Sequence, residues 1–483
     1  MEEKSILEQI REEYSGVTGK ESHYISAKEA RHISKTNNRI TKQLEKRKKR
    51  SASEDEYVCE MKDKNNIVEF DNLHTYFFTD AGVVKSVDGV SFEIPQGSVV
   101  GVVGESGCGK SVTSLSLMQL VQAPQGQIVE GSIRFQSSDF VYGADGKPLP
   151  VYEYVKDEQG NAALDADGNA QILTRPKTDK NGNVVLGKDG QPVLEKVQAI
   201  DEHGFPVFQR VPKTYDIAKM PTSEMRKIRG KEISMIFQEP MTSLNPIFTI
   251  GNQIDEVVLL HTPGATKESA KARSIEMLNL VGIAAADEVY KKYPHELSGG
   301  MRQRVMIAMA LACNPRLIIA DEPTTALDVT IQAQILDLLK SIKEQINGSI
   351  MLITHDLGVI AGMADYVVVM YAGRIIEKGT VEDIFDRPMH PYTVGLQKSK
   401  PVVNQQVEWL YSIPGQVPNP INMPEYCYFK DRCDHCTEQC NGVYPPLVKI
   451  SDTHFVACYN CVRASQPEEG KKTTVKKKTG GKK

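Results

Sequence analysis

The stretch GESGCGKS, Gly104 to Ser111, decides the fold of this chain of 483 residues. It fits the pattern G-x-x-x-x-G-K-[ST], with the apolar run SVVGVV before it and the helical pattern SVTSLSLMQLV after it. A loop of this kind turns its backbone amides toward phosphate oxygens at the positive end of the following helix. Lys110 is expected to reach the β- and γ-phosphates of a nucleotide, and Ser111 to ligate magnesium. The predicted nucleotide-binding residues of the loop are Gly104, Glu105, Ser106, Gly107, Cys108, Gly109, Lys110 and Ser111.

An acidic motif lies further along, in RLIIADEP, Arg316 to Pro323. Four apolar residues that end in an Asp-Glu pair predict a buried strand, which delivers both acids to the carboxyl edge of a sheet. Asp321 is then predicted to hold the magnesium ion, directly or through water. Glu322 points differently and is predicted to orient or deprotonate the attacking water. The alternative is an Asp-Glu pair that only favours a helix start, and the apolar strand directly before the pair argues against it.

Between these motifs lies LSGGMRQR, Leu297 to Arg304, which opens a long helical pattern. Adjacent glycines at a helix start are unfavourable unless the backbone approaches another group closely. The Ser298 hydroxyl and the amides of Gly299 and Gly300 would lie at the positive end of this helix and form a second phosphate receptor. Two receptors for one γ-phosphate predict that the second serves a nucleotide held by a neighbouring subunit.

Together these motifs resemble an ABC-type ATPase, because the phosphate loop, FQEP, LSGGM, ADEP, ALD and THD occur in the order of that family. The resemblance covers residues 67 to about 395 and implies an α/β P-loop NTPase fold with a helical subdomain around LSGGM. It implies that Gln238 of FQEP senses magnesium or water and relays the nucleotide state to a membrane partner. It also implies that His355 of THD contacts the γ-phosphate and that Asp328 of ALD lies at a dimer interface. Since Glu322 is present, an active ATPase is expected.

The resemblance also implies an aromatic side chain upstream of the phosphate loop that stacks on adenine. HTYFF offers Tyr76, Phe77 and Phe78; counting back from SVDGVSF favours Phe77, with Tyr76 as the second candidate and a core role as the alternative. Cys108 stands where the family often has another small residue. A thiol at a helix N-terminus can have a depressed pKa, which predicts that alkylation of Cys108 blocks nucleotide binding and that bound ATP protects the thiol.

Composition and charge indicate the class of protein and the segments into which the chain divides. A net charge of −4, a hydrophobic content of 40% and a charged content of 25% are typical of a soluble globular protein. No run of about 18 apolar residues is present and the N-terminus lacks the apolar core of a signal peptide, so a cytosolic chain is expected. We predict a polar, basic N-terminal extension at 1–66, which contains EKRKKR and is expected to be a solvated and partly disordered arm. The other predicted segments are an ATPase domain at 67–395, an insertion rich in Asx-Gly hairpin turns at about 138–219, a small Cys-rich extension at 396–465 and a disordered Lys-rich tail at 466–483.

Six of the nine cysteines gather near the C-terminus, four of them in CYFKDRCDHCTEQC, Cys427 to Cys440, followed by Cys458 and Cys461. A reducing compartment disfavours structural disulfides, so this density indicates a metal site. Four thiolates bind either one zinc ion or an iron–sulfur cluster, and the C-x2-C spacing of Cys433 and Cys436 is also typical of zinc. The residues alone leave both metals open.

Two further stretches resemble the oligopeptide/dipeptide importer group of ABC ATPases, and its D-type subunit in particular: FQEPMTSLNP (Phe237 to Pro246) and RPMHPYTVGLQKSKP (Arg387 to Pro401). That group carries a C-terminal extension of the form C-x5-C-x6-C, followed by another Cys after a Pro-rich spacer. The resemblance implies a structural four-iron four-sulfur (4Fe-4S) cluster in this chain, with zinc as the alternative. The implied ligands are Cys427, Cys433, Cys440 and Cys458, while Cys436 and Cys461 are left over.

By this resemblance the chain is an ATP-hydrolysing subunit that uses ATP and Mg2+ to power import of dipeptides or oligopeptides. The implied partners are two transmembrane permease subunits, a second ABC ATPase that is related but different, and indirectly an extracytoplasmic peptide-binding protein; no specific nucleic acid is expected. The chain would lie peripherally at the cytoplasmic face of the cell membrane. Two alternatives stay open: the same role in a nickel or metal-complex importer, and a soluble ABC ATPase that acts on ribosomes or DNA. The latter commonly carries two cassettes, whereas this chain has one phosphate loop and one LSGGM motif.

Overall fold

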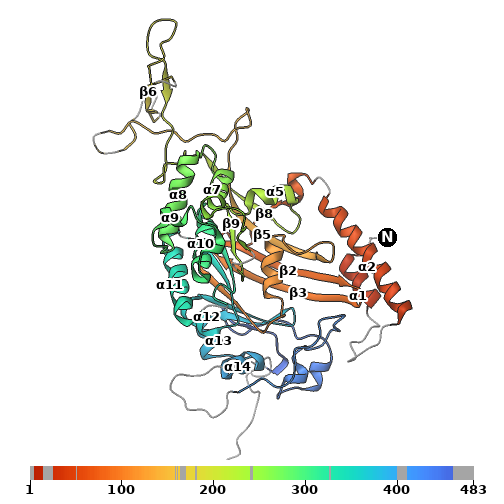
Figure 1. Cartoon of the computed structure of the whole chain (residues 1–483). Coiled ribbons are helices and arrows are strands. Elements are labelled where there is room, and N and C mark those ends of the chain that lie inside the picture. Colours follow the sequence, from red (N-terminus) through yellow and green to blue (C-terminus); the bar gives the residue numbers. More distant parts are fainter. Residues whose placement is uncertain are drawn as a thin grey trace, which may run out of the picture.

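The computed structural model describes residues 5–14, 26–49, 52–157, 159, 161–163, 170–179, 182–239, 243–325, 328–346, 348–399 and 411–460 (Figure 1). The predicted Lys-rich tail, Cys461, and Ala326 and Leu327 of the ALD motif lie outside these residues. Within the described ranges, no helix combines the length and the apolar character that crossing a bilayer requires.

A mixed sheet forms the centre of the molecule, with the strand order β14-β15-β13-β12-β4-β11-β10-β9 in the described chain. The strands from β12 to β9 are parallel, and every residue in them except Tyr366 is buried. Such strands are apolar throughout because both faces of the sheet are covered, one mainly by helices and the other by the second sheet and α4. The parallel strands are β4 Val99–Val103, β9 Ile233–Ile236, β10 Leu317–Asp321, β11 Ser349–Ile353 and β12 Tyr366–Tyr371. The antiparallel edge consists of β13 Arg374–Thr380, β14 Val448–Lys449 and β15 Phe455–Val456.

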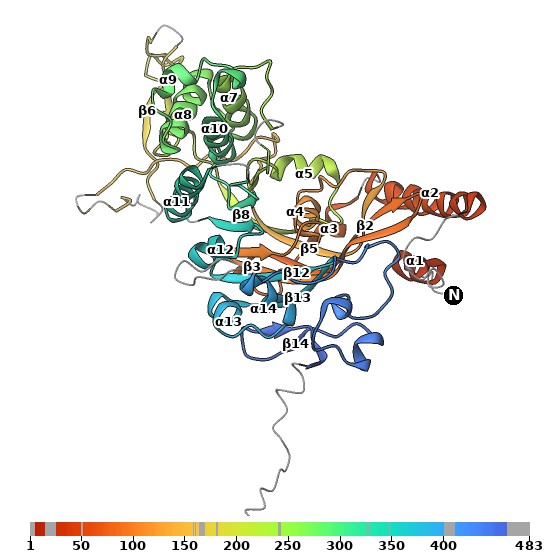
Figure 2. The same cartoon turned by 60° about the horizontal axis from the view of Figure 1, so that its bottom comes forward.

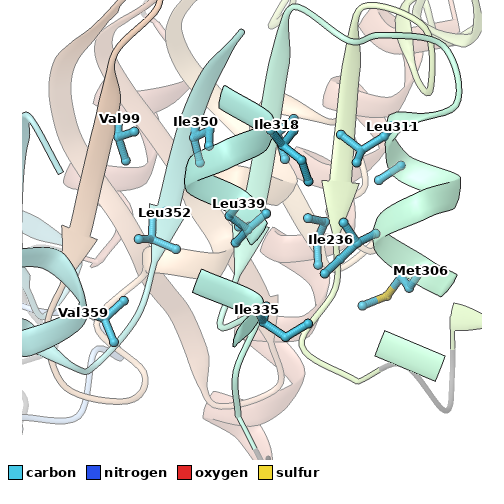
Figure 3. Packing of buried hydrophobic residues seen from close by; sticks show 14 of the residues in the cluster. Val99, Ile236, Met306, Leu311, Ile318, Ile335, Leu339, Ile350, Leu352 and Val359 are labelled. Carbon is cyan, nitrogen blue, oxygen red and sulfur yellow. The ribbon is translucent and has the colours of Figure 1, made fainter. Parts of the chain in front are cut away.

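Hydrophobic clusters form on both faces of this sheet, because alternate strand residues point in opposite directions. Val99 belongs to one cluster and Val100 to the other. Figure 3 shows the first of them, in which Ile335 and Leu339 of α11 lie over the strands that carry Ile318 and the β11 residues. The helices that pack against the sheet are α4 Lys110–Leu117, α10 Gly299–Leu311, α11 Val329–Ile346 and α12 Leu357–Met363.

A second sheet is antiparallel, with the strand order β1-β8-β5-β2-β3. It is tied to the helix after the phosphate loop, since Thr75 Oγ1 lies 2.8 Å from Ser116 Oγ of α4. The strands are β1 Val58–Cys59, β2 Asn66–Thr79, β3 Gly82–Pro95, β5 Gly126–Phe140 and β8 Arg210–Asp216.

The N-terminal extension packs on the outer face of this second sheet, which corrects the prediction of a solvated arm. Helices α1 Ile6–Tyr14 and α2 Ala27–Lys49 contribute apolar side chains to one buried cluster with three strands, and the short α3 Glu54–Tyr57 follows them. Asn37 of α2 accepts a hydrogen bond from Tyr14 Oη at 2.6 Å and donates one to the Thr79 carbonyl at 2.8 Å. The members of this N-terminal cluster are Ile6, Leu7, Ile10, Tyr14, Ile33, Ile40, Leu44, Tyr76, Phe78, Val83 and Val129. The apolar positions of α2 form a single helical stripe, which the many charged residues around it conceal in the sequence.

Helices α7 to α10 form a subdomain around the LSGGM motif, at the end of the molecule away from α2 (Figures 1 and 2). Thr249 and Thr266 cap α7 and α8, where their hydroxyls accept backbone hydrogen bonds from Asn252 and Ser269. The elements of this region besides α10 are α7 Ile250–His261, α8 Lys267–Leu280, α9 Ala286–Val289 and the 3-10 helix η1 Pro294–Glu296, while α5 Thr222–Ile228 packs with the second sheet.

The insertion leaves the second sheet after β5 and returns at β8. It is built from paired extended stretches: β6 Thr174–Pro176 pairs with β7 Leu194–Lys196, and isolated antiparallel bridges continue the pairing on both sides. In Figure 1 it projects beyond α8. Its base is fixed to the helical subdomain, because Phe205 is buried in that core and the His203 ring lies 3.3 Å from Arg273 Nη1 of α8.

The C-terminal extension folds back under the cassette (Figure 2). Asn422 Oδ1 accepts the Val83 N–H at 2.9 Å, and Lys85 Nζ donates to the Met423 carbonyl at 2.9 Å. Glu377, which is fully buried in β13, accepts a hydrogen bond from the His454 ring at 2.8 Å. The helices α13 Val381–Asp386 and α14 Pro391–Lys398 lead into the extension, which contains the 3-10 helices η2 Lys430–Arg432 and η3 Glu438–Asn441.

Candidate nucleotide site

The phosphate loop connects β4 to α4 at the carboxyl edge of the parallel strands. Its glycines have positive φ angles, and two of them leave no room for a side chain: a Cβ on Gly104 would lie 2.2 Å from the Met370 carbonyl oxygen, and one on Gly109 would lie 2.2 Å from that of Ser86. The loop therefore requires glycine at these positions for both conformation and space. Ser106 and Gly107 form its exposed rim.

Lys110 lies inside this loop and is 5% exposed. Its Nζ donates to the Gly104 carbonyl at 2.8 Å and to the Glu105 carbonyl at 3.1 Å. The ammonium group is thus placed among the backbone groups that surround the predicted phosphate position.

Asp321 ends β10 next to the phosphate loop, as predicted. Its Oδ1 accepts a hydrogen bond of 3.0 Å from the Ser111 hydroxyl of α4. Burial raises the pKa of the Asp321 carboxyl, and the neighbouring Glu322 raises it further, while Ser111 and Lys110 oppose the change. A buried carboxylate that local groups compensate only in part suits a divalent cation. The oxygen donors present therefore fit Mg2+.

Three polar side chains from separate segments contact the Glu322 carboxylate. Its Oε2 accepts hydrogen bonds of 2.9 Å from Gln238 Nε2 and from Thr325 Oγ1, and its Oε1 lies 3.5 Å from His355 Nδ1. The residue has φ of +47°, an uncommon backbone conformation for a side chain other than glycine, and its N–H donates to the Ile353 carbonyl of β11. In this conformation the Glu322 carboxylate lies beside Gln238, the predicted sensor, and His355, the predicted γ-phosphate contact.

The LSGGM motif forms the exposed start of α10. The Ser298 hydroxyl caps this helix and accepts the Met301 N–H at 3.3 Å. No atom of the described chain lies within 4 Å of a Cβ built on Gly299, and the nearest one to Gly300 is an Ile331 methyl at 3.5 Å. Asp328 is also exposed and caps the start of α11. The motif thus presents an open backbone surface to the outside of the subunit.

The candidates for adenine stacking in β2 differ in burial and in the face of the sheet to which they point. Tyr76 is 1% exposed, belongs to the N-terminal cluster and donates its hydroxyl to Asp88 at 2.6 Å. Phe77 is half-buried and points to the opposite face, which it shares with Thr75, the residue tied to α4. Phe78 is buried beside Tyr76 in the same cluster. The structure therefore removes Tyr76 as a candidate and leaves Phe77 as the prediction.

Cys108 does not have the reactive thiol that its position suggested. The side chain is fully buried, and this burial raises the pKa of the thiol despite the opposing charge of Lys110. A buried and protonated thiol is a poor nucleophile. The prediction of a depressed pKa at Cys108 is therefore wrong, whereas the effect of alkylation on nucleotide binding stays a prediction.

The four predicted cluster ligands all lie in the C-terminal extension, where three of them influence the pKa of Cys427. Burial, with smaller contributions from the charges of Cys440, Cys458 and Cys433, raises the pKa of the Cys427 thiol to about 12. Cys436 is exposed at the edge of this group, next to Cys440. Across the residues that the structure describes, however, no three His, Cys, Asp or Glu side chains are placed to bind one metal ion.

Comparison with known proteins shows the family of this chain. A family model described as ABC transporter matches residues 87–153 and 209–325, and one described as Oligopeptide/dipeptide transporter, C-terminal region matches residues 376–440. The oligopeptide transport ATP-binding protein AppD of Bacillus subtilis is 41% identical, over 82% of this chain and 97% of its own length. This chain belongs to the oligopeptide/dipeptide family of ABC transporter ATP-binding proteins. The oligopeptide transport ATP-binding protein OppD of Haemophilus influenzae (40%, covering 82% and 97%) and the dipeptide transport ATP-binding protein DppD of B. subtilis (40%, covering 81% and 94%) agree with this assignment.

The ABC cassette assignment makes this chain an ATPase of that type. The two matched parts of the ABC transporter model stop and resume within the insertion, so the gap between them corresponds to the projecting segment. The match to the C-terminal region runs from Ile376 in β13 to Cys440 in η3, and therefore includes three of the four predicted cluster ligands.

A surface groove of about 960 Å³ on α7 and α8 was not predicted from the sequence. Three apolar side chains in it are exposed: Phe248 at 51%, Leu259 at 41% and Leu260 at 73%. The signal for it lies in the run VVLL, since Val258 is buried on the core side of α7 while the two leucines that follow face outward. Its polar rim includes Glu256 and Lys271.

Proposed function

We propose that this chain is the ATP-hydrolysing subunit of an importer for dipeptides or oligopeptides, the role that the names of its relatives describe. The observation that carries the proposal is the convergence of Gln238, Thr325 and His355 on Glu322. Glu322 directly follows Asp321, whose carboxylate accepts a hydrogen bond from Ser111. Together these residues combine a fixed carboxylate with a magnesium-type oxygen site at the edge of the phosphate loop, which is what hydrolysis of a bound nucleotide needs.

The roles of the side chains follow from this geometry. Glu322 would orient the attacking water or accept its proton, and Gln238 and Thr325 hold the carboxylate in place for that task. His355 would contact the transferred phosphate, and Lys110 would stabilise the charge on the β- and γ-phosphates. Mg2+, when bound, neutralises charge on the phosphate oxygens. Ser111, Asp321 and Gln238 are the residues that would hold it.

The open LSGGM surface supports a nucleotide sandwich. Gly299 is exposed, no other segment of the described chain lies within 4 Å of a Cβ built on it, and Ser298 beside it is exposed too. Both would contact the nucleotide of a second, related ABC subunit, whose own LSGGM motif would complete the site on this chain. Asp328 would lie at the same interface.

The groove on α7 and α8 supports docking on membrane permeases. Its exposed Phe248, Leu259 and Leu260 form an apolar floor with a charged rim, which suits a short amphipathic helix of a permease subunit. Two permeases and an extracytoplasmic peptide-binding protein would complete the importer. The chain would then lie peripherally at the cytoplasmic face of the membrane.

We infer that the C-terminal cysteines hold a structural four-iron four-sulfur cluster. Burial and the neighbouring cysteines raise the pKa of Cys427 and Cys433, so the charge of four thiolates here would need a bound metal to compensate it. The match to the C-terminal region of the family includes three of these four cysteines, and a zinc ion bound by the same four thiolates is the alternative. Cys427, Cys433, Cys440 and Cys458 would be the ligands.

Purification from native membranes tests the transport function. The wild-type chain is expected to co-purify with permease subunits and to hydrolyse ATP, while Glu322→Gln should bind ATP and lose hydrolysis by roughly 100-fold or more. Leu260→Glu should lose the permeases, because it places a charge on the groove floor. Leu186→Glu is the matched control, since Leu186 is 60% exposed on the insertion and lies outside the groove. Recovery of the wild-type chain with ribosomes and without membrane proteins would contradict the proposal.

A further inference from the structure

The phosphate loop is held by the C-terminal extension through Glu105. The Glu105 carboxylate forms a bidentate ion pair with Arg432, with Nη1 2.9 Å from Oε2 and Nη2 3.1 Å from Oε1. The Glu105 N–H donates to the Tyr392 hydroxyl at 2.8 Å. Tyr392 comes from α14 at the end of the cassette, and Arg432 comes from the C-terminal extension, 327 residues away in the chain. One residue of the loop is therefore fixed by its side chain and by its backbone.

Arg432 uses its whole guanidinium group in this place. Besides Glu105, it donates from Nε to the Pro414 carbonyl at 2.8 Å, from Nη1 to the Tyr371 hydroxyl at 3.3 Å and from Nη2 to the Ile413 carbonyl at 3.4 Å. These contacts account for all five N–H donors of an arginine, and the side chain is only 6% exposed. A planar fork held in this way permits one orientation of the Glu105 carboxylate.

The position of Arg432 is set by the cysteine segment. It ends the 3-10 helix η2, in which the Lys430 N–H donates to the Cys427 carbonyl and the Cys433 N–H donates to the Lys430 carbonyl. Phe429 in the same turn packs edge-on against Tyr371 and Tyr392, with ring centroids 5.3 and 5.5 Å apart. Two of the predicted cluster ligands thus flank the residue that reaches the loop.

Glu105 is also the residue that receives the loop lysine. Lys110 Nζ donates to the Glu105 carbonyl at 3.1 Å as well as to that of Gly104. A shift of Glu105 would therefore move both the backbone around the phosphate position and the ammonium group that serves it. A displacement of this kind weakens binding, because phosphate recognition depends on the alignment of several donors at once.

We propose that Arg432 is a positioning residue for ATP binding, through which the C-terminal cysteine segment sets the geometry of the phosphate loop. The inference rests on the proposed function, since it takes the loop to bind ATP. It adds to that function a dependence on a segment outside the cassette. Disruption of the cysteine segment would lower ATP affinity without altering any residue that contacts the nucleotide.

The test compares arginine variants of the full-length chain by titration with the fluorescent analogue trinitrophenyl-ATP. Arg432→Ala is expected to weaken binding by about tenfold or more, since a bidentate, buried ion pair is lost. It should raise KM for ATP more than it lowers kcat. Arg432→Lys should fall between Arg432→Ala and wild type, because a lysine offers a point charge without the fork. This conservative variant keeps the test decisive if Arg432→Ala does not fold.

Arg374→Ala is the matched control. Arg374 also joins the cassette to the C-terminal extension, through Asp88 at 2.9 Å and Glu425 at 3.3 Å, and its side chain is 15% exposed. Among the described residues, no hydrogen bond or ion pair joins Arg374 to the phosphate loop, so nucleotide affinity should stay within about twofold of wild type while thermal stability falls. Equal loss of affinity in both alanine variants, or unchanged affinity in Arg432→Ala, would overturn the inference. A wild-type chain that binds no analogue would instead refute the proposed function.

Discussion

Replacement of Ile40 by alanine tests whether the N-terminal helices belong to the folded cassette. Ile40 lies in the middle of α2, is 1% exposed and belongs to the N-terminal cluster. The substitution removes three carbon groups at about 0.8 kcal/mol each, or about 2.4 kcal/mol of burial. A residual cavity brings buried Ile-to-Ala changes to roughly 2–5 kcal/mol, and the better helix propensity of alanine returns about 0.4 kcal/mol. We expect a net loss of about 2–4 kcal/mol in the free energy that holds α2 on the sheet.

Amide hydrogen exchange of the α2 segment measures this loss directly, because such units open without unfolding of the whole chain. At about 1.4 kcal/mol per factor of ten, protection should fall by roughly 30- to 1000-fold in Ile40→Ala. Gln43→Ala is the control on an exposed position of the same helix, and its effect should stay within about 0.5 kcal/mol. If α2 exchanges as fast as an unstructured peptide in the wild type, or if both variants behave alike, the packing described above is refuted.

Two further predictions concern the metal-type sites. Burial raises the pKa of Asp321 above its ordinary value of 3.8, so its carboxylate reduces folding stability once the pH rises above that range. In the absence of Mg2+ and nucleotide, Asp321→Asn should therefore increase resistance to urea at pH 7 but not near pH 3; a difference that does not vary with pH would refute this. In the cysteine group, Cys433→Ala should abolish bound iron and Cys436→Ala should leave it unchanged, as measured by iron and sulfide content. Equal loss in both would show that the ligand assignment is wrong, and zinc in place of iron would favour the alternative metal.

Local patterns predicted much of the nucleotide site. The phosphate loop and the LSGGM start each need a particular backbone within a few residues, so glycines at fixed spacing report them. Asp321 could be predicted because the apolar run before it indicates a buried strand that ends at this acid. In the structure its Oδ1 lies 3.0 Å from Ser111 Oγ. The resemblance added Gln238 and His355, which the structure brings to Glu322.

What the sequence left out depends on long-range packing. The ion pair of Glu105 and Arg432 joins positions 327 residues apart, and no local periodicity connects them. Cys108 was assessed from its helix terminus alone, and burial outweighs that effect. In α2, the few apolar residues stand among many charged ones, so the sequence does not show that they are buried. They form a core only because β2 and β3 present apolar side chains to the same side of α2.

The insertion begins and ends at one pair of opposite residues in the second sheet. Phe140 of β5 is paired with Arg210 of β8, and the next N–H, that of Val141, donates to the Gln209 carbonyl at 3.0 Å. The sheet itself therefore holds the two ends of the insertion together, and each doubling of the length between them adds only about 0.6 kcal/mol of closure entropy. This junction is a natural grafting point. A lineage can lengthen, trim or exchange the segment there, and a protein engineer can replace it with a reporter whose termini are adjacent, without altering the strands that carry the catalytic residues.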